Sequence, residues 1–144
     1  MSAGSGTASR QLPALEPETA FFWTCGVENQ LKIRRCAGCG FYVHPPLPNC
    51  PQCGGTEVSP APVSGRARVA SFTVNHQPWV PGLSVPFVFA AVELVEQKEL
   101  HLFTNIVGCP VEAVRIGMEV AVVFEQQGDI FLPLFRPLEV AHAR

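Results

Sequence analysis

The sequence is poor in charge and contains no long hydrophobic run. Charged residues make up 15% of its 144 residues, and the formal net charge is −2. The first twenty residues include no apolar stretch long enough for a signal peptide or a membrane span, so we expect a cytoplasmic protein with no membrane partner. No internal repeat, heptad or glycine-rich phosphate loop is visible. These absences argue against a membrane protein, a coiled coil and a P-loop nucleotide-binding protein.

A basic stripe is also missing. Between residues 65 and 138 there are five basic side chains against seven acidic ones, whereas a nucleic-acid-binding surface needs clustered cations. Apolar residues, in contrast, make up 47% of the chain. Because so few charged side chains are available to cover them, we expect the surface to keep apolar area for contact with another molecule.

Four of the six cysteines follow one spacing, Cys36-x2-Cys39-x10-Cys50-x2-Cys53. Each Cys-x-x-Cys pair can direct two thiolates at one ion, and two pairs complete a tetrahedral four-sulfur site. A glycine follows each pair, which allows the backbone to turn past the sulfurs. Nothing marks the chain as secreted, so a metal is favoured over two disulfides. The spacing predicts one bound Zn²⁺.

The role and the identity of the metal are less directly indicated. Four cysteines leave no open position for water or substrate, which favours a structural ion. The two pairs, "CAGCG" and "CPQCG", also resemble those of rubredoxin, in which four-sulfur iron carries electrons, but rubredoxins have a longer stretch between the pairs. His44, inside the connecting loop, is expected to be a surface residue and not a ligand.

The chain divides into four parts in this interpretation. Residues 1–15 are small and polar and are expected to be disordered, and residues 16–30 form an N-terminal helix. A rubredoxin-like zinc ribbon covers 31–60, followed by a linker, "SPAPVSG". A β-barrel domain covers 63–140. The predicted fold class is therefore mainly β.

Five strand-like segments follow residue 65: "RARVASFTVN", "FVFAAVELV", "LHLFTNI", "MEVAVVFEQ" and "IFLPLFRPL". The apolar positions of the first change parity, which predicts a bulge or bend near Ala70. Pro133 and Pro137 indicate an edge or a bulge in the last strand. Only one helical turn fits between the third and fourth strands. This pattern predicts a five-stranded Greek-key barrel of the OB type.

Phe21, Phe22 and Trp23 are consecutive in the helix expected from Pro17 to about Val27. On a helix they span a wide arc and cannot all face one small core. Either all three pack on the ribbon, or one or two of them bind another chain, since large aromatic side chains dominate interface anchors.

No catalytic constellation stands out. The free cysteines are Cys25 and Cys109, and a lone cysteine after an apolar strand, such as Cys109, is more often a small buried hydrophobe than a nucleophile. A pairing of Cys109 with His76 or His101 is the one alternative. His76 lies in "NHQPWVPGL", a loop that could contact a partner with Trp79 as its anchor. We therefore predict no catalytic residues.

Six features taken together and in order resemble one family: a helix that carries "FFW", then "LKIRRCAGCG", "PPLPNCPQCG", "SGRARVASFTVNH", "VPFVFAAVEL" and "IGMEVAVVF". It is the family of zinc-ribbon OB-fold proteins of acyl-CoA metabolism, once catalogued as domain of unknown function number thirty-five. The resemblance runs from about residue 17 to 138. It implies a non-catalytic accessory subunit, required by a thiolase-superfamily enzyme such as a thiolase, an acyltransferase or a steroid side-chain aldolase, and acyl-CoA at or near the interface.

Arg34 and Arg35 precede the first cysteine pair. They are either solvated surface charges or contacts for the phosphates of coenzyme A, because guanidinium suits phosphate geometry. Two other functions remain open: nucleic-acid binding, which zinc ribbons and OB barrels both perform elsewhere, and rubredoxin-like electron transfer.

Overall fold

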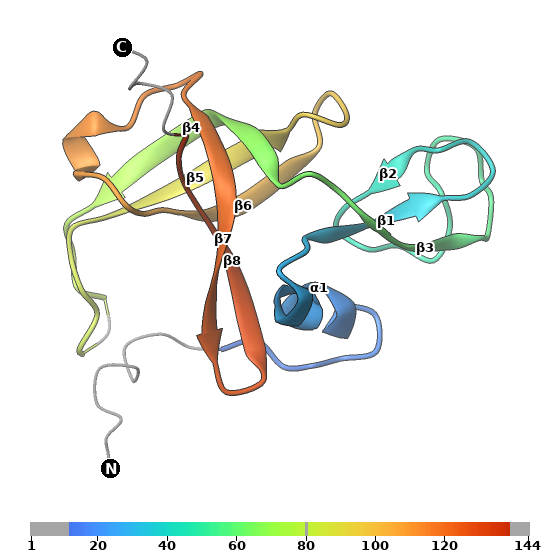
Figure 1. The fold of residues 1–144 in the computed structure, drawn as a ribbon, viewed down its shortest axis with the longest axis horizontal. Helices are drawn as coiled ribbons and strands as arrows, with labels where there is room; N and C mark the ends of the chain where they lie inside the picture. The colour runs from blue at the N-terminus through green and yellow to red at the C-terminus, as the bar shows by residue number, and fades with distance from the viewer. Residues whose placement is uncertain (1–11, 80, 139–144) are drawn as a thin grey trace.

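The computed structural model describes residues 12–79 and 81–138, and the predicted disordered segment 1–15 lies largely outside them. A short helical segment comes first, a three-stranded sheet follows, and a closed five-stranded barrel completes the chain. In Figure 1 the small sheet lies to one side of the barrel, and the helical segment lies between the two. The predicted fold class is confirmed.

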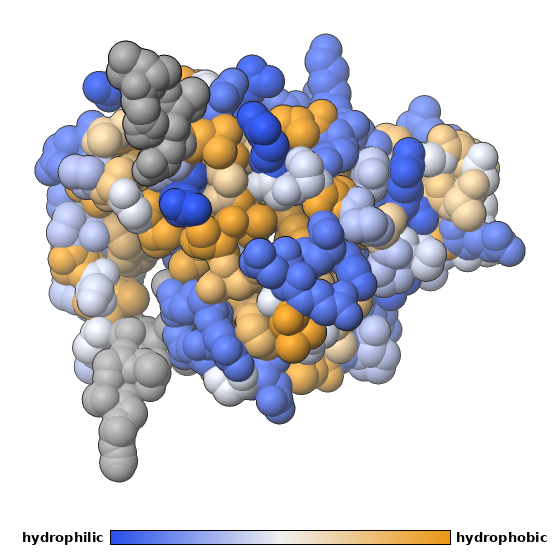
Figure 2. All heavy atoms as spheres, viewed as in Figure 1, coloured by the Kyte–Doolittle hydropathy of each residue, from blue (hydrophilic) through white to orange (hydrophobic). Residues whose placement is uncertain are grey.

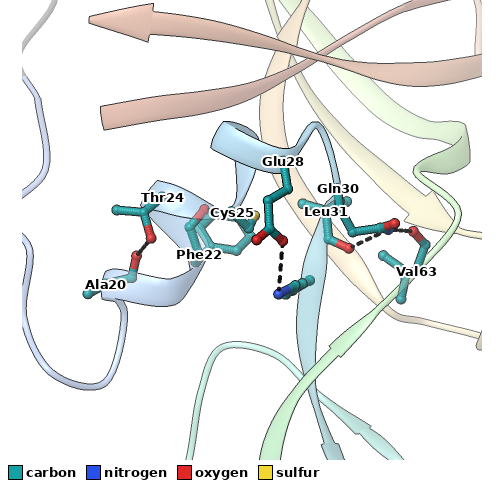
Figure 3. Close-up of polar contacts among 9 residues, drawn as sticks. Ala20, Phe22, Thr24, Cys25, Glu28, Gln30, Leu31 and Val63 are labelled. Carbon is teal, nitrogen blue, oxygen red and sulfur yellow. Dashed lines mark hydrogen bonds and ion pairs between the residues drawn. The ribbon is translucent and has the colours of Figure 1, made fainter. Parts of the chain in front are cut away.

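The N-terminal helical segment is shorter than expected. The α-helix α1 spans Ala20–Thr24 and continues as the 3-10 helix η2, Cys25–Glu28. Residues 17–19 form a turn before the helix. The amide of Ala20 closes this turn by donating to the carbonyl of Glu16 at 2.8 Å. Asn29, in the left-handed conformation with φ 56°, ends the segment. The Thr24 hydroxyl donates back to the Ala20 carbonyl at 2.8 Å (Figure 3).

The small sheet is the predicted ribbon. Its strands are β1 (Lys32–Cys36), β2 (Tyr42–Val43) and β3 (Val58–Pro62), in the order β2-β1-β3. We expected a linker from residue 59, but residues 58–62 form the strand β3. Pro60 and Pro62 are tolerated there because β3 is an edge strand, so a missing N–H on its free side costs no hydrogen bond.

The barrel contains the five predicted strands in the closed order β4-β5-β6-β8-β7. They are β4 (Arg66–Asn75), β5 (Phe87–Leu94), β6 (His101–Ile106), β7 (Glu119–Gln127) and β8 (Ile130–Pro137). Between β6 and β7 there is one 3-10 turn, η3 (Val111–Ala113), as expected. This strand order is that of a Greek-key OB barrel.

The register of β4 confirms the predicted bulge. Its pairing with β5 shifts between Val69 and Ser71, which leaves Ala70 as the extra residue. The bulge lets Val69 and Phe72 both pack in the core despite their opposite parity. Pro133 is also placed as expected: in the backbone ladder it pairs with β7, because the ladder between β8 and β6 is limited to Ile106 and Phe135, and its carbonyl accepts the Thr104 hydroxyl of β6 at 2.8 Å.

One hydrophobic core joins the ribbon, the helical segment and the barrel. Phe22 of α1 and Ile33 of β1 belong to the same buried cluster as Val92 and Phe135 of the barrel. At the crossing point between ribbon and barrel, the Gln30 amide donates to the carbonyls of Leu31, at 3.2 Å, and Val63, at 2.7 Å (Figure 3). The ribbon is therefore attached to the barrel by packing as well as by the chain.

The space-filling view shows apolar residues over the barrel and around the helical segment, with hydrophilic residues between them (Figure 2). Among the described residues, no helix is long and apolar enough to cross a membrane.

Candidate metal centre and partner surface

The four predicted cysteines converge at one end of the ribbon. All four Sγ atoms lie within 4.8 Å of one another. The sulfurs of Cys36 and Cys53 are 3.6 Å apart, as are those of Cys39 and Cys50. Zinc–sulfur bonds of about 2.3 Å in a tetrahedron place the sulfurs roughly 3.8 Å apart, so the spacing fits one zinc ion.

Each cysteine pair sits in a tight turn that the backbone itself stabilises. The amide of Gly40 donates to the carbonyl of Cys36, and the amide of Gly54 to that of Cys50, both at 2.8 Å. Both glycines have positive φ, 84° and 79°, which glycine adopts without strain. The amide of Gln52 points at the Cys50 sulfur, 3.3 Å away, and supports a thiolate there.

The electrostatics of the cluster favour a bound cation. Backbone amides of Cys39 and Gly38, together with the Cys53 thiol, lower the pKa of Cys36 to about 7. The Phe41 amide lowers the pKa of Cys39, but desolvation and the neighbouring thiols outweigh it and raise it to about 12. Four thiolates this close repel one another, and a divalent cation among them offsets that repulsion.

His44 is not the surface residue that the sequence suggested. It is half-buried beside the helical segment, where its ring centroid lies 5.2 Å from that of Phe22. Burial lowers its pKa to about 4, and its Nδ1 atom has no hydrogen-bond partner among the described residues. The expectation was wrong because β2 carries the loop towards α1, a contact between segments that no local pattern encodes.

Arg34 and Arg35 lie on opposite faces of β1. The guanidinium of Arg34 donates to the carbonyls of Val58, at 3.0 Å, and Glu18, at 3.3 Å, and lies 5.2 Å from the centroid of the Phe21 ring. It therefore links the helical segment to the ribbon. Arg35 is exposed, donates to the Gly40 carbonyl at 2.9 Å and lies over the ring of Tyr42. The predicted contact with coenzyme A phosphate stays a prediction.

The three consecutive aromatic residues pack largely within the chain. Phe22 is 7% exposed and belongs to the main core. Phe21 and Trp23 are half-buried against it, and Trp23 also contacts a second cluster on β8, formed by Ile130, Leu132 and Leu134. We predicted that these residues contact a partner. That stays a prediction, and in this structure it concerns the exposed parts of Phe21 and Trp23.

The loop residues His76 and Trp79 are exposed, and Trp79 keeps 71% of its surface in solvent. Its indole N–H donates to the Asn75 side chain at 2.9 Å. Cys109 is half-buried against the core, and burial raises the pKa of its thiol. His101 begins β6 and Cys109 follows its end, so the strand separates the two residues.

Two exposed aromatic residues were missed by the sequence interpretation. "FVFAAVELV" reads as a continuous apolar strand, but Phe89 is 47% exposed and Phe103 of β6 is 72% exposed. A signal was present in β6, where Phe103 shares its parity with the polar His101 and Asn105, while Leu102 and Ile106 face the core.

Family models match both halves of the chain. The model described as "ChsH2, rubredoxin-like zinc ribbon domain" matches residues 23–59, and "ChsH2, C-terminal OB-fold domain" matches residues 61–125. The chain belongs to the ChsH2, or DUF35, family. The match to a zinc ribbon favours zinc over iron in the four-cysteine site. ChsH2 family membership also confirms the resemblance that the sequence suggested.

Two relatives of this ChsH2-family chain are named as alpha subunits of hydratases. It is 37% identical over 131 residues to a "Probable enoyl-CoA hydratase alpha subunit" of Thermomonospora curvata, and 37% identical over 127 residues to the "3-oxo-4,17-pregnadiene-20-carboxyl-CoA hydratase alpha subunit" of Mycobacterium tuberculosis. The matches cover 90% and 88% of this chain but only 40% of each relative.

Two further relatives are covered more fully. The "Benzoylsuccinyl-CoA thiolase subunit BbsA" of Thauera aromatica is 31% identical, with 68% of this chain and 71% of BbsA covered. A solved structure named "Ltp2-ChsH2(DUF35) aldolase" is 36% identical with a TM-score of 0.78, and the match covers 88% of this chain and 98% of that one.

Proposed function

We propose that this chain is a non-catalytic, zinc-binding accessory subunit of a thiolase-superfamily enzyme. In this role it binds the enzyme subunit and helps to form or stabilise its acyl-CoA site. The enzyme requires it, but the chain performs no bond-making or bond-breaking step of its own.

The likeness to the Ltp2-ChsH2(DUF35) aldolase carries this proposal, since 36% identity over nearly the whole of that chain goes beyond a shared fold. That name describes an aldolase that contains both Ltp2 and ChsH2. BbsA supports the same conclusion, because it is named as a subunit of a thiolase. Both names describe enzymes that act together with a second component, and both belong to acyl-CoA or aldolase chemistry.

The arrangement of side chains supports a non-catalytic role. Cys109 has a raised pKa, whereas a nucleophile needs an accessible thiolate and an adjacent base. Four cysteines saturate a tetrahedral zinc ion, so the metal would hold the ribbon in shape and offer no position to substrate.

Acyl-CoA is proposed to lie close to the interface. Arg35 is exposed beside the zinc turns and can present its remaining N–H groups to a phosphate, while Arg34 orients the helical segment behind it. We also propose that the protein acts in the cytoplasm, where clustered cysteines remain reduced and available to zinc.

Reconstitution tests this function. The Ltp2-type subunit from the same source organism is assayed with its acyl-CoA substrate alone and after addition of this chain. We expect turnover to rise with the concentration of this chain and to saturate at a fixed ratio of subunits. Full activity of the enzyme subunit alone, unchanged by addition, would contradict the proposal.

A further inference from the structure

Two stacked aromatic rings stand on the outside of the barrel. The centroids of Phe89 and Phe103 are 5.9 Å apart, and the ring planes differ by 12°. The two residues come from neighbouring strands, β5 and β6, and occupy diagonal positions: Phe89 pairs with Asn105, and Phe103 pairs with Ala91. Their alternation with the buried Val88, Ala90 and Leu102 fixes them on the outer face.

The exposure of these rings is unusual in a barrel whose own core is complete. A phenylalanine side chain presents about 150–250 Å² of mostly apolar surface, and leaving it in water is unfavourable. Neighbouring side chains on this face leave the rings uncovered, since Phe103 keeps 72% of its surface exposed. Contiguous exposed apolar area of this kind marks an interaction site.

Trp79 extends the same face at one end. Its indole donates to Asn75, and the Asn75 amide donates to the carbonyl of Gln77 at 2.7 Å, so the loop is held against the end of β4. Asn75 pairs with Phe87, two residues before Phe89 on β5. We define the aromatic face by its outward residues Thr73, Trp79, Phe89, Ala91, Phe103 and Asn105.

The charge of the aromatic face distinguishes between kinds of partner. None of its six residues is ionisable. It is bordered on the same outer face by Glu93 and His101, which pair across β5 and β6, and Glu93 accepts the amide of Glu99 at 2.6 Å. Arg68 of β4 pairs with Glu93 and belongs to this bordering row, beyond the bulge at Ala70, and Arg66 lies further towards the start of the strand. Stacking of nucleic-acid bases needs cations beside the aromatic rings to hold the phosphates. An apolar centre without charge is instead typical of the core of a protein–protein interface.

We propose that the aromatic face is the surface on which the thiolase-superfamily subunit binds. This inference rests on the proposed function and adds the place of contact and the chemistry of the partner. The surface of that subunit opposite Phe89 and Phe103 is neutral and apolar, with a pocket or flat patch that receives the two rings. β5, at the centre of the face, is paired along its length with both β4 and β6 and has no free strand edge, so the partner binds the side chains on the face.

Two variants test the face. Phe89→Thr/Phe103→Thr removes the rings but keeps residues suited to strands, and Trp79→Ala removes the loop anchor. Ile116→Thr is the matched control, because Ile116 is 70% exposed but lies in the loop before β7. Each variant is first checked for bound zinc and an unchanged melting temperature, and its affinity for the Ltp2-type subunit of the same organism is then measured.

We expect the double variant to raise Kd by at least ~30-fold and Ile116→Thr to change it by less than ~3-fold. Hydrogen exchange on the wild-type complex should show new protection in residues 87–94 and 101–106. Binding of the folded double variant within ~3-fold of wild type, or no protection in these strands, overturns the inference while leaving the proposed function intact.

Other occupants give different results. If wild-type chain binds no Ltp2-type subunit, the proposed function fails, and this inference fails with it. If the free chain forms dimers that the double variant abolishes, the face binds a second copy. If single-stranded oligonucleotide binds wild type but not the double variant, the face binds nucleic acid. Either of these last two results also overturns the inference.

Discussion

Gly26 lies directly against Phe131. A Cβ atom added to Gly26 would stand 2.5 Å from the Cβ of Phe131 and 2.7 Å from Cδ1 of Phe124. Gly26 belongs to η2, and the two phenylalanines belong to the β7–β8 hairpin. The absence of a side chain at residue 26 therefore allows the helical segment to pack closely on the barrel, and Phe22 and Trp23 are positioned by that contact.

Gly26→Ala should destabilise the protein by about 1–3 kcal/mol, because the methyl group overlaps backbone-proximal atoms that cannot move away easily. Denaturant unfolding monitored by tryptophan fluorescence gives the value. Val27→Ala, at the adjacent and exposed position, is the control and should change stability by less than about 0.5 kcal/mol. Equal effects of the two substitutions would contradict the close packing.

Replacing any one of Cys36, Cys39, Cys50 or Cys53 with serine should abolish stoichiometric zinc and unfold the ribbon. Structural zinc supplies roughly 10 kcal/mol or more of folding free energy in small domains. Elemental analysis and circular dichroism measure the two effects. Cys109→Ser, which lies outside the site, should keep one zinc per chain. A soluble, folded and metal-free protein would show that the ribbon does not depend on the ion.

Cys109→Ala and His101→Ala should leave the turnover of the reconstituted enzyme within a small factor of wild type. The loss of a true nucleophile costs several orders of magnitude. Single-turnover kinetics on complexes of verified composition separate chemistry from assembly. If either variant stops turnover while the complex still forms, this chain contributes to the active site.

Stability should depend on His44 in weakly acidic solution. Its pKa is about 4 in the fold, below the ordinary value of 6.5, so the folded protein holds the neutral imidazole. Above pH 6.5 the free energy of unfolding is therefore not reduced by His44, and it decreases as the pH falls from there through about 4. The loss is on the order of 2–3 kcal/mol.

His44→Phe provides the comparison, because it keeps a ring beside Phe22 but does not titrate. The unfolding free energy of wild type should fall relative to this variant between pH 6.5 and 4.5. Protonation of the zinc ligands affects both proteins alike and cancels in the difference. Parallel curves for wild type and variant would show that His44 is not desolvated in the fold.

Local patterns predicted the metal site and the barrel. The four cysteines need only their spacing to meet around one ion, and the parity change in β4 identified the bulge at Ala70 without knowledge of any other strand. The single turn η3 was likewise visible as a short gap between two strands. In each case the information lies within about twenty residues of chain.

Contacts between distant segments could not be predicted in this way. His44 is half-buried beside Phe22 of α1, and Arg34 donates to the carbonyls of Glu18, in the turn before α1, and Val58, in β3. The outward direction of Phe89 depends on which face of β5 the closed barrel covers. Composition in β5 is apolar on both faces, so periodicity alone gave no choice between them.

The central claim is that this chain works as a subunit of a thiolase-superfamily enzyme. Size-exclusion chromatography with light scattering, on the chain alone and after co-expression with the Ltp2-type subunit of the same organism, tests it most directly. We predict a single co-eluting hetero-oligomer that contains one zinc per copy of this chain and stays intact on dilution to micromolar concentration. Separate elution of this chain from the enzyme subunit would contradict the claim.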